Sequence, residues 1–211
     1  MIIDEGGLWC EIDYAGSADG PALFLDRDGV IVADTRYLGR PEDLRMIQGA
    51  AAAIAQCNAL EIPVVLVTNQ SGIARGYYDW NSFRNVQVAM SEALAAAGAH
   101  IDAVLACAYH ADGRAPLRIA DHPWRKPNPG MILEAARRMG VDLSRSWIVG
   151  DTASDLVAGK TAGLMGGTLI ISEDQDGQQA RLLANRHFVV ETAASLADAV
   201  ALLVARKRFS S

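Results

Sequence analysis

The sequence predicts an α/β fold: a doubly wound, Rossmann-like parallel sheet with helices on both faces. Two observations predict it. Short apolar runs bounded by turn-forming residues recur along the chain, and longer segments with helical spacing lie between them. Strands that alternate with helices are typical of a parallel sheet covered on both sides. With 211 residues, of which 51% are hydrophobic and 21% charged, the chain is long enough for one ordinary globular domain.

Six apolar runs are predicted to be buried strands, because each is short and is flanked by turn-forming residues. They lie at 22–26, 63–68, 102–109, 146–151, 167–171 and 187–190. Five segments between or after them have the composition and spacing of helices. They lie at 49–60, 82–98, 129–140, 154–163 and 196–207.

The segment before the first strong strand is interpreted as an addition to the domain. Residues 1–21 end in the Gly-, Ser- and Asp-rich stretch AGSADGP, which is typical of a turn. We expect an N-terminal extension, either a hairpin or a lid, packed on a single domain of residues 22–211. From the sequence it either flanks the pocket or extends the sheet.

The charge balance and the cysteines exclude several classes of protein. Lys and Arg total 19 against 25 Asp and Glu, a net charge of −6, so the basic footprint of a DNA or anionic-membrane binder is missing. Three scattered cysteines make no disulfide framework, and the first residues are acidic where a signal peptide would be basic and then apolar. We expect a cytoplasmic monomer with no nucleic-acid or membrane partner.

Polar side chains follow several of the predicted strands. In a parallel sheet, ligands bind beyond the carboxyl ends of the strands, so these side chains are the candidates for a site. A lysine in the loop RKPNPG, before a predicted helix, joins them. The set comprises Asp26, Asp28, Thr68, Asn69, Asp151 and Lys126. Acids, a hydroxyl and a fixed cation together favour phosphate chemistry.

Cleavage of a phosphate monoester needs a nucleophile, a proton donor for the leaving oxygen and positive charge near the phosphoryl oxygens. Asp26 is predicted to attack phosphorus and form an aspartyl-phosphate. Asp28, two residues further along an extended chain and therefore facing the same pocket, is predicted to protonate the leaving group and then to activate water. Two carboxylates repel a phosphate dianion, so Mg²⁺ is expected as cofactor, with Asp151 completing its site. Thr68 and Lys126 supply hydrogen bonds and charge.

Four ordered segments, FLDRDGVI, VTNQSGIARG, RKPNPGM and IVGDTASD, resemble the motifs of the haloacid dehalogenase superfamily of phosphatases. TNQSGIARG followed by RKPNPGM is similar to the branch of the heptose 1,7-bisphosphate and histidinol-phosphate phosphatases. The resemblance implies a haloacid dehalogenase-type fold, with Asp26 as nucleophile and Asp28 as acid and base. It implies Mg²⁺ held by the Asp26 carboxylate, the Asp28 carbonyl and Asp151, and a phosphoryl group steadied by Thr68 and Lys126.

The resemblance also implies a set of substrate-binding residues in the loops around these motifs. They are Asp34, Thr35, Arg36, Tyr37, Asn69, Gln70, Ser71, Arg125 and Thr152. Arg75, in the loop GIARGYY, is expected either to meet a second phosphate of the substrate, which is favoured, or to be solvated. Asp155 is expected either to orient Lys126 or a metal-bound water, or to cap the helix that follows it.

The resembling branch commonly carries a zinc loop, from which this sequence departs. Cys107 stands at the first ligand position, His110 one place late, and His122 and Trp124 where cysteines would stand. Structural zinc usually takes four ligands, and three remain here. Either Cys107, His110 and His122 bind Zn²⁺ with a further ligand, or the metal is lost and Trp124 fills the loop by packing.

The intervals from Asp26 to Thr68 and from Thr68 to Lys126 are too short for an inserted cap domain, so a capless fold is expected. An uncapped site suits a small sugar phosphate held by loops, and the branch implies a heptose 1,7-bisphosphate that loses its 7-phosphate. Histidinol phosphate or another sugar phosphate is the alternative substrate. The alternative class is a phospho-Asp signalling or binding module without turnover, which the presence of Asp28 beside the nucleophile disfavours.

Overall fold

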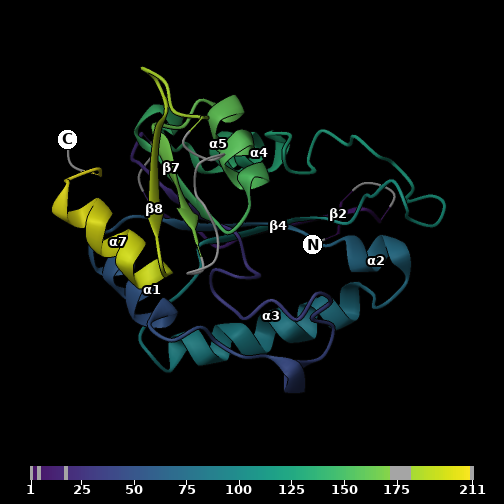
Figure 1. The fold of residues 1–211 in the computed structure, drawn as a ribbon. Coiled ribbons are helices and arrows are strands. Elements are labelled where there is room, and N and C mark those ends of the chain that lie inside the picture. The colour runs from purple at the N-terminus through teal and green to yellow at the C-terminus, as the bar shows by residue number, and fades with distance from the viewer. Residues whose placement is uncertain (1, 4–5, 17–18, 172–181, 210–211) are drawn as a thin grey trace.

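An eight-stranded sheet forms the centre of the computed structural model, with helices above and below it (Figure 1). The structure describes residues 2–3, 6–16, 19–171 and 182–209. The strand order is β1-β2-β5-β4-β3-β6-β7-β8. The six strands from β5 to β8 in this order are parallel, and β1 and β2 are antiparallel to their neighbours. The predicted doubly wound α/β class is confirmed.

Every predicted strand and helix has a counterpart among the described elements. The strands are β1 (Ile2–Ile3), β2 (Leu8–Ile12), β3 (Leu23–Leu25), β4 (Val64–Asn69), β5 (Ala103–Cys107), β6 (Trp147–Gly150), β7 (Gly166–Ile170) and β8 (Val189–Ala193). The α-helices are α1 (Ala50–Ala59), α2 (Ser71–Arg75), α3 (Trp80–Ala95), α4 (Gly130–Met139), α5 (Ala153–Ala162) and α7 (Leu196–Ala205). Two short 3-10 helices, η1 (Pro41–Asp43) and η2 (Leu143–Arg145), lie in loops.

The core consists of two apolar layers, one on each face of the sheet. Helices α4 and α5 cover one face and pack on side chains such as Phe24, Val65 and Leu105. Helices α1, α3 and α7 cover the other face and pack on the alternate side chains of the same strands, including Leu23 and Leu66. The central strands are buried on both sides, which is why they read as continuous apolar runs in the sequence.

The N-terminal residues add to the sheet. Strand β2 pairs with β5 in antiparallel register from Leu8–Cys107 to Ile12–Ala103, and β1 pairs with β2. Trp9 of β2 packs in a third, smaller cluster with Trp80 and Phe83 of α3. Residues 1, 4–5 and 17–18 of the predicted extension lie outside the described residues.

The connections of the sheet reverse direction at β3. From this strand the chain proceeds to β4 and β5 on one side and later to β6, β7 and β8 on the other. Such a switch point opens a crevice at the carboxyl ends of the strands, where ligands bind in open α/β sheets. The intervals between Asp26 and Lys126 contain only η1, α1, β4, α2, α3, β5 and their loops. The expected capless architecture is therefore confirmed.

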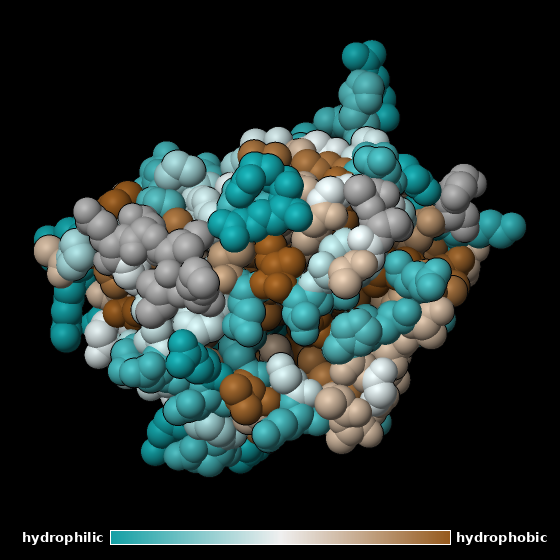
Figure 2. Space-filling view, turned by 180° about the vertical axis from the view of Figure 1, so that it is seen from behind, coloured by the Kyte–Doolittle hydropathy of each residue, from teal (hydrophilic) through white to brown (hydrophobic). Residues whose placement is uncertain are grey.

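Teal hydrophilic and brown hydrophobic residues alternate in small patches on the face seen from behind (Figure 2). Scattered exposed apolar side chains of this kind are normal on a globular protein. Within the described part of the chain, none of the helices combines the length and the apolar character that crossing a membrane requires.

Candidate active site

A cleft of about 210 Å³ lies at the carboxyl end of the sheet, around the switch point. Asp26 follows β3, Asn69 ends β4, and Asp151 follows β6. The cleft is lined by Asp26, Asp28, Asp34, Arg36, Asn69, Lys126, Asp151, Thr152, Ser154 and Asp155. Three larger hollows of the described surface lie away from these residues, two along β2 and one near the start of β4. The smaller cleft is the candidate active site because the predicted phosphate-handling side chains meet there.

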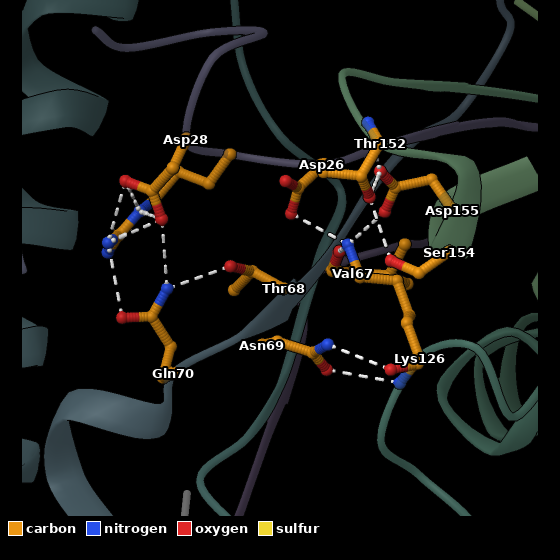
Figure 3. Close-up of polar contacts among 11 residues, drawn as sticks. Asp26, Asp28, Val67, Thr68, Asn69, Gln70, Lys126, Thr152, Ser154 and Asp155 are labelled. Atoms are coloured by element: carbon orange, nitrogen blue, oxygen red, sulfur yellow. Dashed lines mark hydrogen bonds and ion pairs between the residues drawn. The ribbon is translucent and has the colours of Figure 1, made fainter. Parts of the chain in front are cut away.

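Lys126 is the cation at the base of this cleft. Its side chain is 3% exposed, and its Nζ lies 2.7 Å from Asp26 Oδ1, 2.5 Å from Asp155 Oδ1 and 2.7 Å from the carbonyl oxygen of Val67 (Figure 3). Although burial lowers the pKa of Lys126, the carboxylates of Asp155 and Asp26 raise it further, to well above its ordinary value. The lysine is therefore a fixed positive charge between two acids.

Negative charge nevertheless exceeds positive charge here. Oxygen atoms of Asp26, Asp151 and Asp155 all lie within 4.8 Å of one another, with one lysine among them. Burial raises the pKa of Asp26 to about 7, an effect that Lys126 reduces and Asp155 and Asp28 increase. Burial and the charge of Asp155 likewise raise the pKa of Asp151 to about 6. An oxygen-lined site with unbalanced negative charge suits a hard divalent cation.

Asp155 has both of the roles that the sequence left as alternatives. Its Oδ1 forms the ion pair with Lys126, and its Oδ2 accepts hydrogen bonds from the backbone N–H of Thr152 at 3.1 Å and from its hydroxyl at 2.7 Å. The bond from the Thr152 N–H is one half of a capping box at the start of α5, in which the Thr152 side chain also accepts from the Asp155 N–H. Both oxygens are engaged by the protein, so Asp26 and Asp151 keep more freedom to bind a cation.

Gly29 allows the chain to turn next to the acidic group. Its φ is +78°, and an added Cβ would lie 2.2 Å from Oδ2 of Asp151. We expect Gly29→Ala to displace the Asp151 carboxylate and to raise the Mg²⁺ concentration needed for half-maximal activity by about tenfold or more, besides the cost of about 1 kcal/mol for the backbone strain.

Gly98→Ala is the matched control for this prediction. Gly98 has a φ of +72° but no atom within 4 Å of an added Cβ, so the alanine there carries the strain without the clash. Melting temperatures of both variants, with and without Mg²⁺, separate strain from metal binding. An unchanged Mg²⁺ dependence in Gly29→Ala would show that Asp151 does not bind the metal.

Two amide side chains that were predicted to bind substrate form hydrogen bonds with neighbouring parts of the protein. Asn69 donates through Nδ2 to the carbonyl of Lys126 at 3.0 Å and accepts from its N–H at 3.1 Å, which fixes the loop that carries the lysine. Gln70 donates to Thr68 and Asp28 and accepts from Tyr78 and Arg27. All four hydrogen-bonding positions of the Gln70 amide are engaged by side chains of the protein.

Of the other predicted substrate residues in these loops, three line the cleft and three do not. Asp34, Arg36 and Thr152 line the cleft, and Asp34 accepts a hydrogen bond from the Arg36 N–H at 2.6 Å. Thr35 and Tyr37 are exposed in the same loop as Asp34, and the Tyr37 ring lies 4.5 Å from that of Tyr77. Ser71 is half-buried at the first residue of α2. The residues of this set that line the cleft are therefore polar or charged.

A second group of basic side chains comes from α2 and from the loop after β5. Arg75 Nη2 lies 3.2 Å from His110 Nε2 and 3.2 Å from Asp112 Oδ2, and Arg125 donates to the Tyr109 carbonyl at 3.1 Å. Burial, with the charges of Arg125 and Arg75, lowers the pKa of His110. Burial also lowers the pKa of Arg125, and the charge of Arg75 contributes to that shift. The surroundings of the two arginines therefore disfavour further positive charge and suit an anion.

The zinc prediction is not supported, because Cys107, His110 and His122 do not form a metal-binding group. Among the described residues, Asp26, Asp151 and Asp155 are the one set of three potential ligands within 4.8 Å. His110 faces Arg75, and the ring of His122 stacks on Tyr109 with centroids 4.2 Å apart. Trp124 packs against the adjacent core.

Sequence reasoning missed one charged residue buried beside the site. The motifs assign no role to Arg27, between the two motif acids, yet it is 1% exposed and forms an ion pair with Asp28. The available signal was a charged residue next to an otherwise apolar segment, since a buried arginine needs a partner.

Three comparisons with known proteins agree on the family. Residues 123–199 match a family model described as HAD-hydrolase-like. The chain is 54% identical over 174 residues to the D-glycero-beta-D-manno-heptose-1,7-bisphosphate 7-phosphatase of Mesorhizobium japonicum, covering 81% of this chain and 80% of that protein. It is 35% identical over 175 residues to the enzyme of the same name from Pasteurella multocida, covering 83% and 94%.

Comparison with solved structures indicates the same family. A HAD-like phosphatase structure from Mesorhizobium loti matches with a TM-score of 0.86 and 42% identity, over 100% of this chain and 98% of that one. The D,D-heptose 1,7-bisphosphate phosphatase of B. bronchiseptica, complexed with magnesium and phosphate, matches with a TM-score of 0.73 and 30% identity, over 88% and 99%.

The fold and the site define a phosphatase of the haloacid dehalogenase type. Within that superfamily, the chain belongs to the family of the D-glycero-D-manno-heptose 1,7-bisphosphate 7-phosphatases.

Proposed function

We propose that this enzyme hydrolyses the 7-phosphate of D-glycero-beta-D-manno-heptose 1,7-bisphosphate through an aspartyl-phosphate on Asp26. The observation that carries the reaction is the buried contact of Asp26 with Lys126 beside Asp151. The relatives at 54% and 45% identity are named for the beta anomer, and one at 39% for the alpha anomer. These names support the choice of substrate and anomer.

In this proposal, Oδ2 of Asp26 attacks phosphorus while Oδ1 stays bound to Lys126. The bond from phosphorus to the sugar oxygen breaks, and the Asp28 carboxyl transfers its proton to that oxygen. Water then attacks the phosphoryl group, Asp28 takes a proton from it, and the bond between phosphorus and Asp26 breaks. Lys126 and Thr68 bind the phosphoryl oxygens.

Mg²⁺ is the proposed cofactor. The carboxylates of Asp26 and Asp151, with the backbone carbonyl of Asp28, are the proposed ligands, and the excess negative charge of the three clustered acids supports the fit. When bound, the cation would neutralise part of the phosphoryl charge in the transition state. A relative of 30% identity has been solved with magnesium and phosphate.

The second phosphate of the substrate is proposed to bind at Arg75 and Arg125. Both are half-buried near His110, whose lowered pKa leaves it neutral at physiological pH. Two guanidinium groups make a fitting partner for a dianion. The rim residues Asp34, Arg36 and Thr152 are proposed to bind the sugar hydroxyls. A cytoplasmic, monomeric enzyme of one domain with an N-terminal extension stays a prediction.

The test is phosphate release from both heptose 1,7-bisphosphate anomers and from histidinol phosphate, each with Mg²⁺ or with EDTA. We expect Mg²⁺-dependent turnover of the beta anomer to exceed that of histidinol phosphate by orders of magnitude. Preferential turnover of histidinol phosphate would contradict the substrate but not the mechanism. Lack of turnover with every phosphate monoester would favour a binding module.

The contribution of Arg75 has its own expected result. Arg75→Ala removes a guanidinium from the proposed second phosphate site, so KM for the bisphosphate should rise about tenfold or more, as for loss of one charge-assisted contact. KM for a heptose 7-phosphate without the second phosphate should change little. Arg118→Ala, in the loop after β5, removes a hydrogen bond to the Gly113 carbonyl and is the control for loop disorder. Equal KM increases for both substrates would refute the assignment.

A further inference from the structure

Arg27 is buried beside the active site without lining it. Its side chain is 1% exposed and lies on the α3 side of the chain, where its guanidinium stands 5.5 Å from the ring centroid of Phe83 and Nη1 lies 3.3 Å from Gln87 Oε1. A guanidinium removed from water is costly unless it is paired and hydrogen-bonded. The identity of its partners therefore indicates why an arginine is kept there.

The partner is the carboxylate of Asp28. Nη2 of Arg27 lies 3.0 Å from Oδ2 and 3.1 Å from Oδ1, and Nε lies 3.3 Å from each oxygen. The Asp28 side chain is 25% exposed and lines the cleft. The planar guanidinium of Arg27 thus binds one side of the Asp28 carboxylate, and the other side remains open to the cleft.

Gln70 binds the same carboxylate and is itself fixed. Its Nε2 donates to Asp28 Oδ2 at 3.2 Å and to Thr68 Oγ1 at 2.8 Å (Figure 3). Its Oε1 accepts from Arg27 Nη2 at 3.1 Å and from the Tyr78 hydroxyl at 2.6 Å. Burial raises the pKa of Tyr78 to about 12, so its hydroxyl stays protonated and donates. The orientation of the amide follows from these four contacts.

The backbone of Arg27 is held by hydrogen bonds, as its side chain is. Its carbonyl accepts hydrogen bonds from the N–H groups of Ile31 at 2.9 Å and Val32 at 3.1 Å, which close the loop after β3. Asp28 forms an isolated bridge with Val32 in the same loop. Both ends of the contact between Arg27 and Asp28 are therefore fixed by one short loop.

We propose that Arg27 is a positioning residue for Asp28 and that, together with Gln70, it orients the carboxyl group that serves the leaving oxygen and the attacking water. The inference rests on the role of Asp28 proposed above. Arg27 itself touches neither substrate nor metal in this arrangement. Its effect on the reaction passes through the direction in which the Asp28 oxygens point.

A substrate with a good leaving group isolates this role. The sugar alkoxide needs a proton when its bond to phosphorus breaks, whereas p-nitrophenolate leaves without one. Formation of the aspartyl-phosphate from p-nitrophenyl phosphate therefore does not need Asp28, but its hydrolysis by water still does. Loss of Asp28 positioning should leave a rapid burst of p-nitrophenolate, close to one equivalent per enzyme, before a slow steady state.

The variants are Arg27→Met, Arg27→Lys and, as matched control, Gln87→Leu. Arg27→Met should lower kcat for the heptose bisphosphate by about 100-fold, within the usual contribution of general acid–base catalysis, and keep the burst rate within about threefold of wild type. Arg27→Lys keeps the charge but loses the fork, so it should recover part of the loss. Gln87→Leu removes a contact of Arg27 that does not involve Asp28 and should change neither reaction more than about threefold.

The outcomes separate this inference from the proposed function. Two results would overturn the positioning role. One is an Arg27→Lys variant with a wild-type melting temperature in which the burst rate and the bisphosphate turnover fall equally. The other is an Arg27→Met variant with wild-type kinetics. If Arg27→Met does not fold, Arg27→Lys carries the test alone. Asp28→Asn is the benchmark, because it should show the burst while Asp26→Asn shows none. Absence of the burst in Asp28→Asn, or its presence in Asp26→Asn, would refute the proposed roles of the two acids rather than that of Arg27.

Discussion

Replacement of Asp26 by asparagine is expected to abolish turnover. The amide introduced by Asp26→Asn keeps the size and a polar contact for Lys126 but is no nucleophile, so kcat should fall by about 10⁴-fold or more, as for other lost nucleophiles. The wild-type enzyme, quenched with acid during turnover, should carry a phosphoryl group on the peptide containing Asp26. Mass spectrometry of the quenched enzyme checks this second statement, because the variant should carry none.

The thermal stability of Asp26→Asn, unlike its turnover, is not expected to fall. Burial raises the pKa of Asp26 to about 7 from an ordinary value of 3.8, so the folded protein favours the protonated form. Stability from this group is present below the ordinary pKa and is lost as pH rises toward 7. The uncharged amide of Asp26→Asn avoids that loss, so without Mg²⁺ the melting temperature of the variant at about pH 8 should be no lower than that of wild type.

Asp43→Asn is the matched control for Asp26→Asn. The Asp43 side chain is 46% exposed and pairs with Arg40 at η1, so the same change of charge there should leave turnover unchanged. Retention of activity in Asp26→Asn, or a phosphoryl group found on another residue, would contradict the proposed mechanism. Loss of activity with a collapsed melting temperature would show a structural role instead.

The sequence predicted those parts of the fold that depend on local pattern. The runs ending in Asp26, Thr68 and Asp151 are continuous and apolar, because these strands are buried on both faces. For the last strand the apolar pattern predicts 187–190, whereas β8 extends over Val189–Ala193. The apolar run ends before Glu191, a charged residue that ion pairs with Arg206 and Arg208 allow to be buried. A local apolar pattern does not reveal ion pairs between residues that are so far apart in the sequence.

The same limit applies to the site. Motif spacing correctly placed Asp26 and Asp151 at the ends of parallel strands, which share one edge, and Lys126 of the loop before α4 joins them there. Spacing did not reveal that Asn69 and Gln70 hydrogen-bond to the protein, since their partners include the backbone of Lys126 and the side chains of other loops. Sequence position indicates which residues are near a site, whereas their hydrogen-bond partners within the protein are visible only in the structure.

Removal of Lys126 is expected to damage both activity and stability. Lys126→Met leaves Asp26 and Asp155, both buried or nearly so, without their shared cation. Removing one partner of a buried ion pair costs about 3–5 kcal/mol, which for a chain of this length lowers Tm by on the order of 10 °C. Turnover should fall by about 10³-fold or more, since the charge that binds the phosphoryl oxygens is lost.

A double variant separates these two effects. In Lys126→Met with Asp155→Asn, one unpaired negative charge is removed with the lysine, so much of the lost Tm should return while turnover stays low. Added Mg²⁺ should also raise the Tm of Lys126→Met more than that of wild type, because the unpaired acids attract the cation. Melting curves and kcat for wild type, both single variants and the double variant complete the cycle. Additive Tm changes would mean that Lys126 and Asp155 do not depend on each other, and recovery of turnover in the double variant would mean that the lysine only balances Asp155 and does not act on the phosphoryl group.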